Sequence, residues 1–108
     1  METVTETTSA ATRLKWRFIE AERLAALDAT GRALYAGLSA LRVRLAREIG
    51  IPAYRVLTNR QLLVVCECRP YDVEALAIVA GIGPLTLRAY GADIIAAVRA
   101  LLELDRGV

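Results

Sequence analysis

The chain has 108 residues, of which 56% are hydrophobic, and its formal net charge is +2. This length predicts a single domain with a modest core, and the hydrophobic fraction argues against an intrinsically disordered chain. Because the chain contains no histidine, Ser-His and Cys-His nucleophile pairs and histidine-containing metal sites are excluded, which favours a binding module over an enzyme.

The chain begins with a polar leader, which is followed by a segment of ambiguous secondary structure. Residues 1–13 form an acidic, threonine-rich leader without apolar periodicity, and we expect this leader to be disordered. It has neither the basic nor the apolar region of a signal peptide. Residues 14–27 alternate like a strand at Leu14, Trp16 and Phe18, but their alanine and glutamate content favours a helix, so this segment is either helical or extended.

A long helix is predicted to open the folded domain, which we place at residues 28–108. Asp28 or Thr30 can cap this helix, and Gly50 followed by Pro52 ends it. The side of the helix that faces the core is marked by four leucines at helical spacing, namely Leu34, Leu38, Leu41 and Leu45.

Shorter helices are predicted to follow an irregular connector at residues 51–57. Together with the preceding segments they give an all-α fold, a compact bundle of five to six short helices with a helix-hairpin-helix-like turn. The first of these helices is capped by Thr58 or Asn59 and reaches about Cys68, and the second covers residues 73–79 and is capped by Asp72. The third runs from Pro84 to Tyr90-Gly91, and the last covers residues 92–104.

The cysteines and the apolar stretches point to no cofactor, metal or membrane. Cys66 and Cys68 are one residue apart, so alone they form neither a four-ligand zinc site nor a disulfide framework. Free thiols in a small domain favour a reducing cytoplasm. The most apolar stretch, residues 76–102, is interrupted by glycines, a proline and charged residues, which indicates buried helices and not a membrane span.

The turn Gly81-Ile82-Gly83 is a candidate phosphate seat. Glycines let the backbone approach a ligand closely, and the N–H groups that open the next helix carry the positive end of its dipole. Pro84 removes one of these donors, and Arg88 in the same helix is a candidate cation. The alternative is a sharp turn that only lets two helices pack.

The connector supplies a second candidate, because Tyr54 is followed by Arg55 and, in the next helix, by Arg60. A tyrosine beside arginines can stack on a base next to a phosphate contact, and such stacking contributes about 1–3 kcal/mol per base. The alternative is that Tyr54 closes the core and presents only its hydroxyl group.

Charge is distributed unevenly along the chain. Residues 32–60 contain six arginines against Glu48 alone, a net charge of +5, whereas the segments on either side are net negative. Arg44 and Arg47 project from the side of their helix opposite the leucines, and Arg42 lies at the edge of the leucine stripe, where its role is structural or functional. Arginine suits bidentate contacts with phosphate, so the basic segment favours nucleic acid.

The order of these motifs resembles the HRDC domain (helicase and RNase D C-terminal), found in RecQ-type helicases and RNase D. The resemblance covers residues 28–104 and rests on the series L-R-V-R-L-A, I-P-A-Y-R-V-L, P-Y-D, G-I-G and Y-G. It departs from the family pattern at Ala75, where a glutamate is frequent. The resemblance implies a helical bundle and a non-catalytic accessory role that contacts single-stranded or structured DNA.

The resemblance also implies which residues contact DNA and in what setting. The resemblance places Tyr54 at a DNA-contact position of the family, Arg55 and Arg60 at basic positions near it, and Arg44 and Arg47 at arginine positions of the first helix. No phosphate-binding loop of a helicase motor is present, so we expect a free-standing or excised module that binds junction or single-stranded DNA weakly and in a salt-sensitive way. The alternative function is an adaptor for a helicase, nuclease or reverse transcriptase, with residues 14–19 as its docking or dimer surface.

Overall fold

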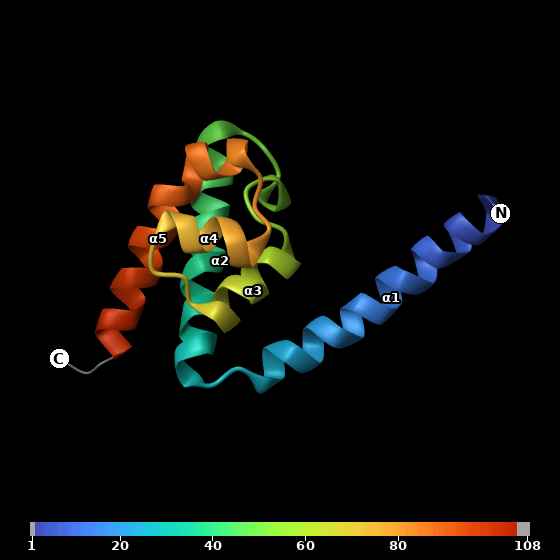
Figure 1. Ribbon diagram of the computed structural model, residues 1–108, viewed down its shortest axis with the longest axis horizontal. Coiled ribbons are helices and arrows are strands. Elements are labelled where there is room, and N and C mark those ends of the chain that lie inside the picture. The colour runs from blue at the N-terminus through green and yellow to red at the C-terminus, as the bar shows by residue number, and fades with distance from the viewer. Residues whose placement is uncertain (1, 106–108) are drawn as a thin grey trace.

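The computed structural model describes residues 2–105, which fold almost entirely into helices (Figure 1). The described residues form five α-helices and one short 3-10 helix and contain no strand, which confirms the predicted all-α bundle. In chain order the elements are α1 (Glu2–Ala26), α2 (Ala29–Ile49), η1 (Ala53–Arg55), α3 (Asn59–Cys68), α4 (Val73–Ala80) and α5 (Pro84–Asp105).

Capping side chains fix where three of the helices begin. Asp28 accepts a hydrogen bond from the backbone N–H of Gly31 at 2.8 Å at the start of α2. At the start of α3, Thr58 and Gln61 form a reciprocal capping box, and Asp72 caps α4 through its carboxylate. The sequence leaves Asp28 or Thr30 as the cap of α2 and Thr58 or Asn59 as the cap of α3. In the structure, the caps are Asp28 and Thr58.

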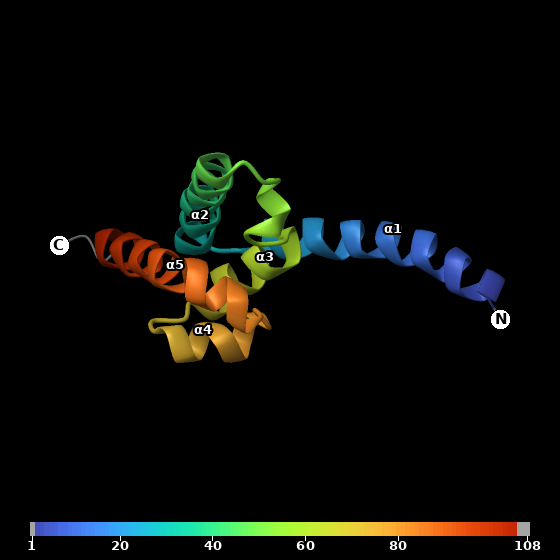
Figure 2. The same ribbon diagram turned by 90° about the horizontal axis from the view of Figure 1, so that it is seen from above.

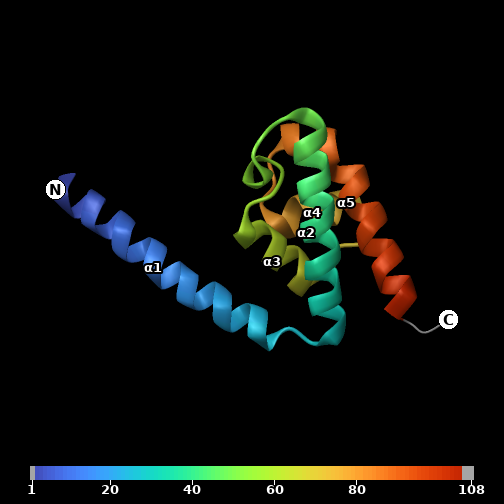
Figure 3. The ribbon, with the colours of Figure 1, turned by 180° about the vertical axis from the view of Figure 1, so that it is seen from behind.

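The core lies where α2 and α5 run side by side in opposite directions, with α3 and α4 closing the bundle (Figures 1 and 3). Each of these four helices contributes fully buried apolar side chains, and burial stabilises the fold by about 1.5–3 kcal/mol for each large one. They include Leu34 and Leu38 from α2, Leu62 and Leu63 from α3, Leu76 from α4, and Ile94 and Val98 from α5. The predicted leucine stripe of α2 is confirmed, since three of its leucines are buried and Leu41 packs against them.

Two glycines that the sequence marks as helix ends behave differently. Gly50 takes a left-handed conformation, with a φ of 83°, and ends α2 as predicted. The predicted break at Tyr90-Gly91 is wrong, because α5 continues through it. Gly91 is buried, and atoms of Val73 and Leu87 lie 3.6 Å from the position that its Cβ would take. Packing against α4 here outweighs the penalty of about 1 kcal/mol for a glycine inside a helix.

Helix α1 leaves the bundle, and its N-terminal half lies away from the other helices in all three views (Figures 1, 2 and 3). The segment 14–27, which the sequence leaves either helical or extended, is helical up to Ala26. The structure differs from the expected disordered leader at residues 1–13, because residues 2–13 belong to the same helix; Met1 lies outside the described residues. Extending a helix that is already anchored needs no new nucleus, and Ala10 and Ala11 favour its continuation.

Candidate nucleic-acid interface

Tyr54 points outward from η1, the short helix that joins α2 to α3. Pro52 precedes it with a φ of −64°, and Val56 and Leu57, which follow it, are buried. Ile51 and Ala53 also pack against the core, and the ring of Tyr54 between these anchored residues is 63% exposed. The alternative in which this ring closes the core is therefore wrong, and its face is free to stack on a base.

Arg42 ties this connector to α2. Its Nη1 atom donates a hydrogen bond of 2.9 Å to the carbonyl oxygen of Leu57 and another of 2.9 Å to the Oδ1 atom of Asn59. One guanidinium group thus holds the end of the connector and the first residue of α3 against α2. Of the two roles that the sequence leaves open for Arg42, the structural one is confirmed.

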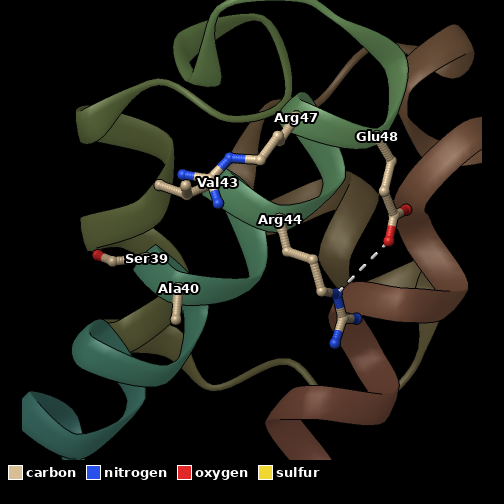
Figure 4. A pocket seen from close by; sticks show the side chains of 6 residues that line it. All are labelled: Ser39, Ala40, Val43, Arg44, Arg47 and Glu48. Carbon is tan, nitrogen blue, oxygen red and sulfur yellow. Dashed lines mark ion pairs between the residues drawn. The ribbon is translucent and has the colours of Figure 1, made fainter.

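Arg47 lies on the outer face of α2, as predicted, whereas Arg44 lies at the edge of that face beside α5. The Nε atom of Arg44 lies 4.0 Å from a carboxylate oxygen of Glu48, and both side chains are largely exposed, so this pair contributes little to stability. Arg47 has no ion-pair partner within residues 2–105. Both arginines line a shallow pocket whose other residues are Ser39, Ala40, Val43 and Glu48 (Figure 4).

Arg60 differs from the other candidates because α1 covers part of it. Its guanidinium carbon lies 3.9 Å from the centre of the Trp16 ring, the geometry of a cation–π interaction. Arg60 remains exposed and lines a small pocket with Glu20, Thr58 and Asn59. An anion that binds here would meet the carboxylate of Glu20 as well as the guanidinium group of Arg60.

The turn between α4 and α5 has an open backbone. Gly81 is left-handed, with a φ of 64°, and no atom lies within 4 Å of the positions that Cβ atoms would take at Gly81 and Gly83. Ile82 between them is buried and anchors the turn, while Arg88 is exposed in the following helix. A ligand can therefore approach this backbone closely, as the glycines led us to expect.

The candidate residues do not converge on one site. Seen from above, α2 and the connector lie on one side of α3, and α4 with the turn that follows it lies on the other (Figure 2). Arg44 is turned toward α5, where it lines a groove with Asp93. The residues therefore form two separate surfaces, one around Tyr54 and the outer face of α2, the other around the turn between α4 and α5.

Some of the arginines in the basic segment have structural partners. The Nη1 atom of Arg32 donates a 2.5 Å hydrogen bond to the carbonyl oxygen of Leu27, and Arg42 is engaged as described above. The sequence gives no indication that Trp16 contacts Arg60, because the two residues are far apart in the chain. The sequence does show that Trp16 is aromatic and lies in a short apolar segment, which marks it as a residue that contacts another part of the molecule but does not identify that part.

The two thiols differ in burial. Burial raises the pKa of the Cys66 thiol to about 12, and the charge of Glu67 adds to the effect, so the thiol stays protonated at neutral pH. Cys68 is exposed, and both cysteines are free. The described residues hold no group of His, Cys, Asp and Glu side chains suited to a metal ion, and none of their helices is long and apolar enough to span a bilayer.

Comparisons with known proteins agree with this architecture. Residues 31–98 match the family model of the HRDC domain. The chain is 39% identical over 62 residues to the ATP-dependent DNA helicase UvrD2 of Mycobacterium bovis and to that of Mycobacterium tuberculosis. The match takes in 57% of this chain but only 9% of each helicase. No solved structure matches the chain.

Proposed function

Because the chain belongs to the HRDC domain family, we propose that it is a non-catalytic accessory module that binds single-stranded or structured DNA. Its relatives are named as DNA helicases, which supports a role beside an enzyme that acts on DNA. Two free thiols support a cytoplasmic setting for this role.

The observation that carries the proposal is the exposure of Tyr54 between two anchored ends of the connector. The ring stacks on a base in our proposal, while Arg55 beside it and Arg47 on α2 neutralise phosphates. Arg44 and Arg60 add further phosphate contacts at the edges of this surface. The Gly81–Gly83 turn, with Arg88, is a separate contact for a second segment of a forked or folded strand.

Replacement of Tyr54 tests the proposal. We expect Tyr54→Ala to weaken binding of a fluorescent single-stranded oligonucleotide by about tenfold or more, because one stacked base is lost. Tyr54→Phe keeps the ring and is expected to bind like the wild type. Equal affinities of wild type and Tyr54→Ala, measured by anisotropy at one salt concentration, would count against the assignment. Duplex, forked and RNA oligonucleotides in the same assay define the preferred substrate.

An adaptor that docks on a helicase, nuclease or reverse transcriptase is the second candidate function. The observation that favours it is the exposure of Leu14 and Phe18 on α1. If the chain is an adaptor, Phe18→Glu is expected to lose the protein partner and Tyr54→Ala to keep it. If the chain is a nucleic-acid module, Tyr54→Ala is the one of these two variants that is expected to lose the oligonucleotide.

A further inference from the structure

The chain exposes more surface than a compact monomer of its size. Its accessible surface is 7139 Å², whereas a compact monomer of 11.8 kDa exposes about 5,900 Å². Its radius of gyration is 15.2 Å, against about 13 Å for a compact chain of 108 residues. Helix α1 extends away from the bundle (Figures 1 and 3). This shape leaves the side of α1 that faces away from α3 available to a partner.

One face of α1 is already occupied by α3. Trp16 lies under the guanidinium of Arg60, Arg23 forms an ion pair with Glu67, and Leu24 packs against the core. These side chains recur at helical spacing, so they define a single docked face of α1. The opposite face is exposed at Leu14 and Phe18, while Ala21 at its edge lines a cavity with Leu24 and Tyr35.

That opposite face carries an exposed apolar stripe with a coiled-coil repeat. Its members are separated alternately by three and four residues, the a and d spacing of a helix that pairs with another helix. They are Ala11, Leu14, Phe18, Ala21 and Ala25, and all five are exposed. Leu14 is 63% exposed and Phe18 75% exposed, so the two largest side chains of the stripe lack cover within residues 2–105.

The stripe is complementary to itself in one orientation. Its large residues, Leu14 and Phe18, precede its small ones, Ala21 and Ala25. A parallel pair would place phenylalanine beside phenylalanine and alanine beside alanine, leaving gaps. An antiparallel pair places Phe18 over Ala21 of the second copy and Leu14 over Ala25 of the second copy, so each of these layers combines one large and one small residue.

The charges beside the stripe fit the same orientation. Lys15 and Glu22 are exposed and seven residues apart, so they lie on the same flank of α1. In the antiparallel pair, Lys15 of each copy faces Glu22 of the other, and the two-fold symmetry makes this ion pair twice. We propose that two copies of this chain associate through the α1 stripe as an antiparallel helix pair.

Sedimentation velocity over a range of protein concentrations tests the proposal. The wild type is expected to dimerise, and Phe18→Glu to raise the dissociation constant roughly 100-fold, because two phenylalanine contacts are lost. Leu104→Glu is the matched control: Leu104 is 75% exposed on α5, and its replacement is expected to leave the dimer intact. Fluorescence of Trp16, the single tryptophan, checks that α1 stays docked on α3 in each variant.

A charge exchange tests the orientation. Lys15→Glu and Glu22→Lys are each expected to weaken the dimer by about tenfold, because each places like charges together twice, and the double variant is expected to restore wild-type affinity. A wild type that stays monomeric at every concentration would overturn the proposal, whether or not the stripe binds another protein. The proposal would also be overturned if Leu104→Glu weakened the dimer as much as Phe18→Glu does, or if the double variant did not regain the dimer affinity of the wild type.

Discussion

Arg42 links the fold to the candidate site, because its two hydrogen bonds hold the segment that presents Tyr54. Arg42→Ala removes both hydrogen bonds of Nη1 and leaves the carbonyl oxygen of Leu57 without this partner. We expect the free energy of unfolding to fall by about 1–3 kcal/mol and oligonucleotide affinity to fall with it, since the connector loosens. Chemical denaturation and anisotropy measure the two effects.

Arg47→Ala is the matched control for Arg42→Ala. Arg47 is exposed on the same helix and makes no ion pair within residues 2–105, so its removal is expected to weaken binding while stability stays within about 0.5 kcal/mol of the wild type. If Arg42→Ala were as stable as the wild type, the anchoring role of Arg42 would be wrong.

Single residues with local partners could be predicted from the sequence, and those with distant partners could not. Asp28, Thr58 and Asp72 cap helices as their types and positions indicated, because a cap bonds to backbone groups a few residues away. The sequence predicts a phosphate contact for Arg60, and in the structure its side chain also stacks on Trp16. Which aromatic ring lies beside an arginine depends on how two helices pack, and spacing along the chain does not contain that information.

Helix α1 is tied to α3 by an ion pair. Both guanidinium donors of Arg23 bond to the carboxylate of Glu67 on α3, one of them at 2.8 Å. This hydrogen bonding, with the charge of Arg23, holds the pKa of Glu67 below its usual value of 4.5. The carboxylate therefore stabilises the docked helix at neutral pH, and this contribution is lost as pH falls below 4.5 through the lowered pKa.

We expect the fluorescence of Trp16 to report release of α1 in acid. Wild type is expected to show a transition below pH 4.5, and Glu67→Gln to show weaker docking at neutral pH with most of that transition removed. The hydrogen bond from Gly31 and the nearby Arg69 also lower the pKa of Asp28, so a small residual change is expected in the variant. Identical acid profiles for wild type and Glu67→Gln would contradict this role for the ion pair.

The sequence predicts which segments are helical more accurately than it predicts where each helix begins and ends. The leucine stripe and the caps identified α2, α3 and α4, because these signals are local. Gly91 predicted a break that α5 does not have, since its packing beside Val73 is decided by tertiary contact. The threonine-rich start of the chain resembles a disordered leader in composition, whereas the structure continues α1 through it.

At the scale of the whole molecule, the net charge of a chain segment predicts a basic surface less well than the position of each arginine side chain does. The basic segment 32–60 has a net charge of +5, but Arg32 and Arg42 hold backbone carbonyls and Arg44 turns toward α5. The HRDC resemblance, in contrast, was confirmed by the family match, because it rests on motifs in series and not on a sum. The arginines of the basic segment therefore do not form one uniformly basic face.

The most direct test of the nucleic-acid function is the salt dependence of oligonucleotide binding. Four phosphate contacts, from Arg44, Arg47, Arg55 and Arg60, predict that log affinity falls against log salt with a slope near −3 on a single strand. Titrating a labelled oligonucleotide at several salt concentrations and following its anisotropy gives that slope. A slope near −3 that shrinks in Arg47→Ala is the predicted result; an affinity that does not change with salt, or no binding even at low salt, would contradict the account.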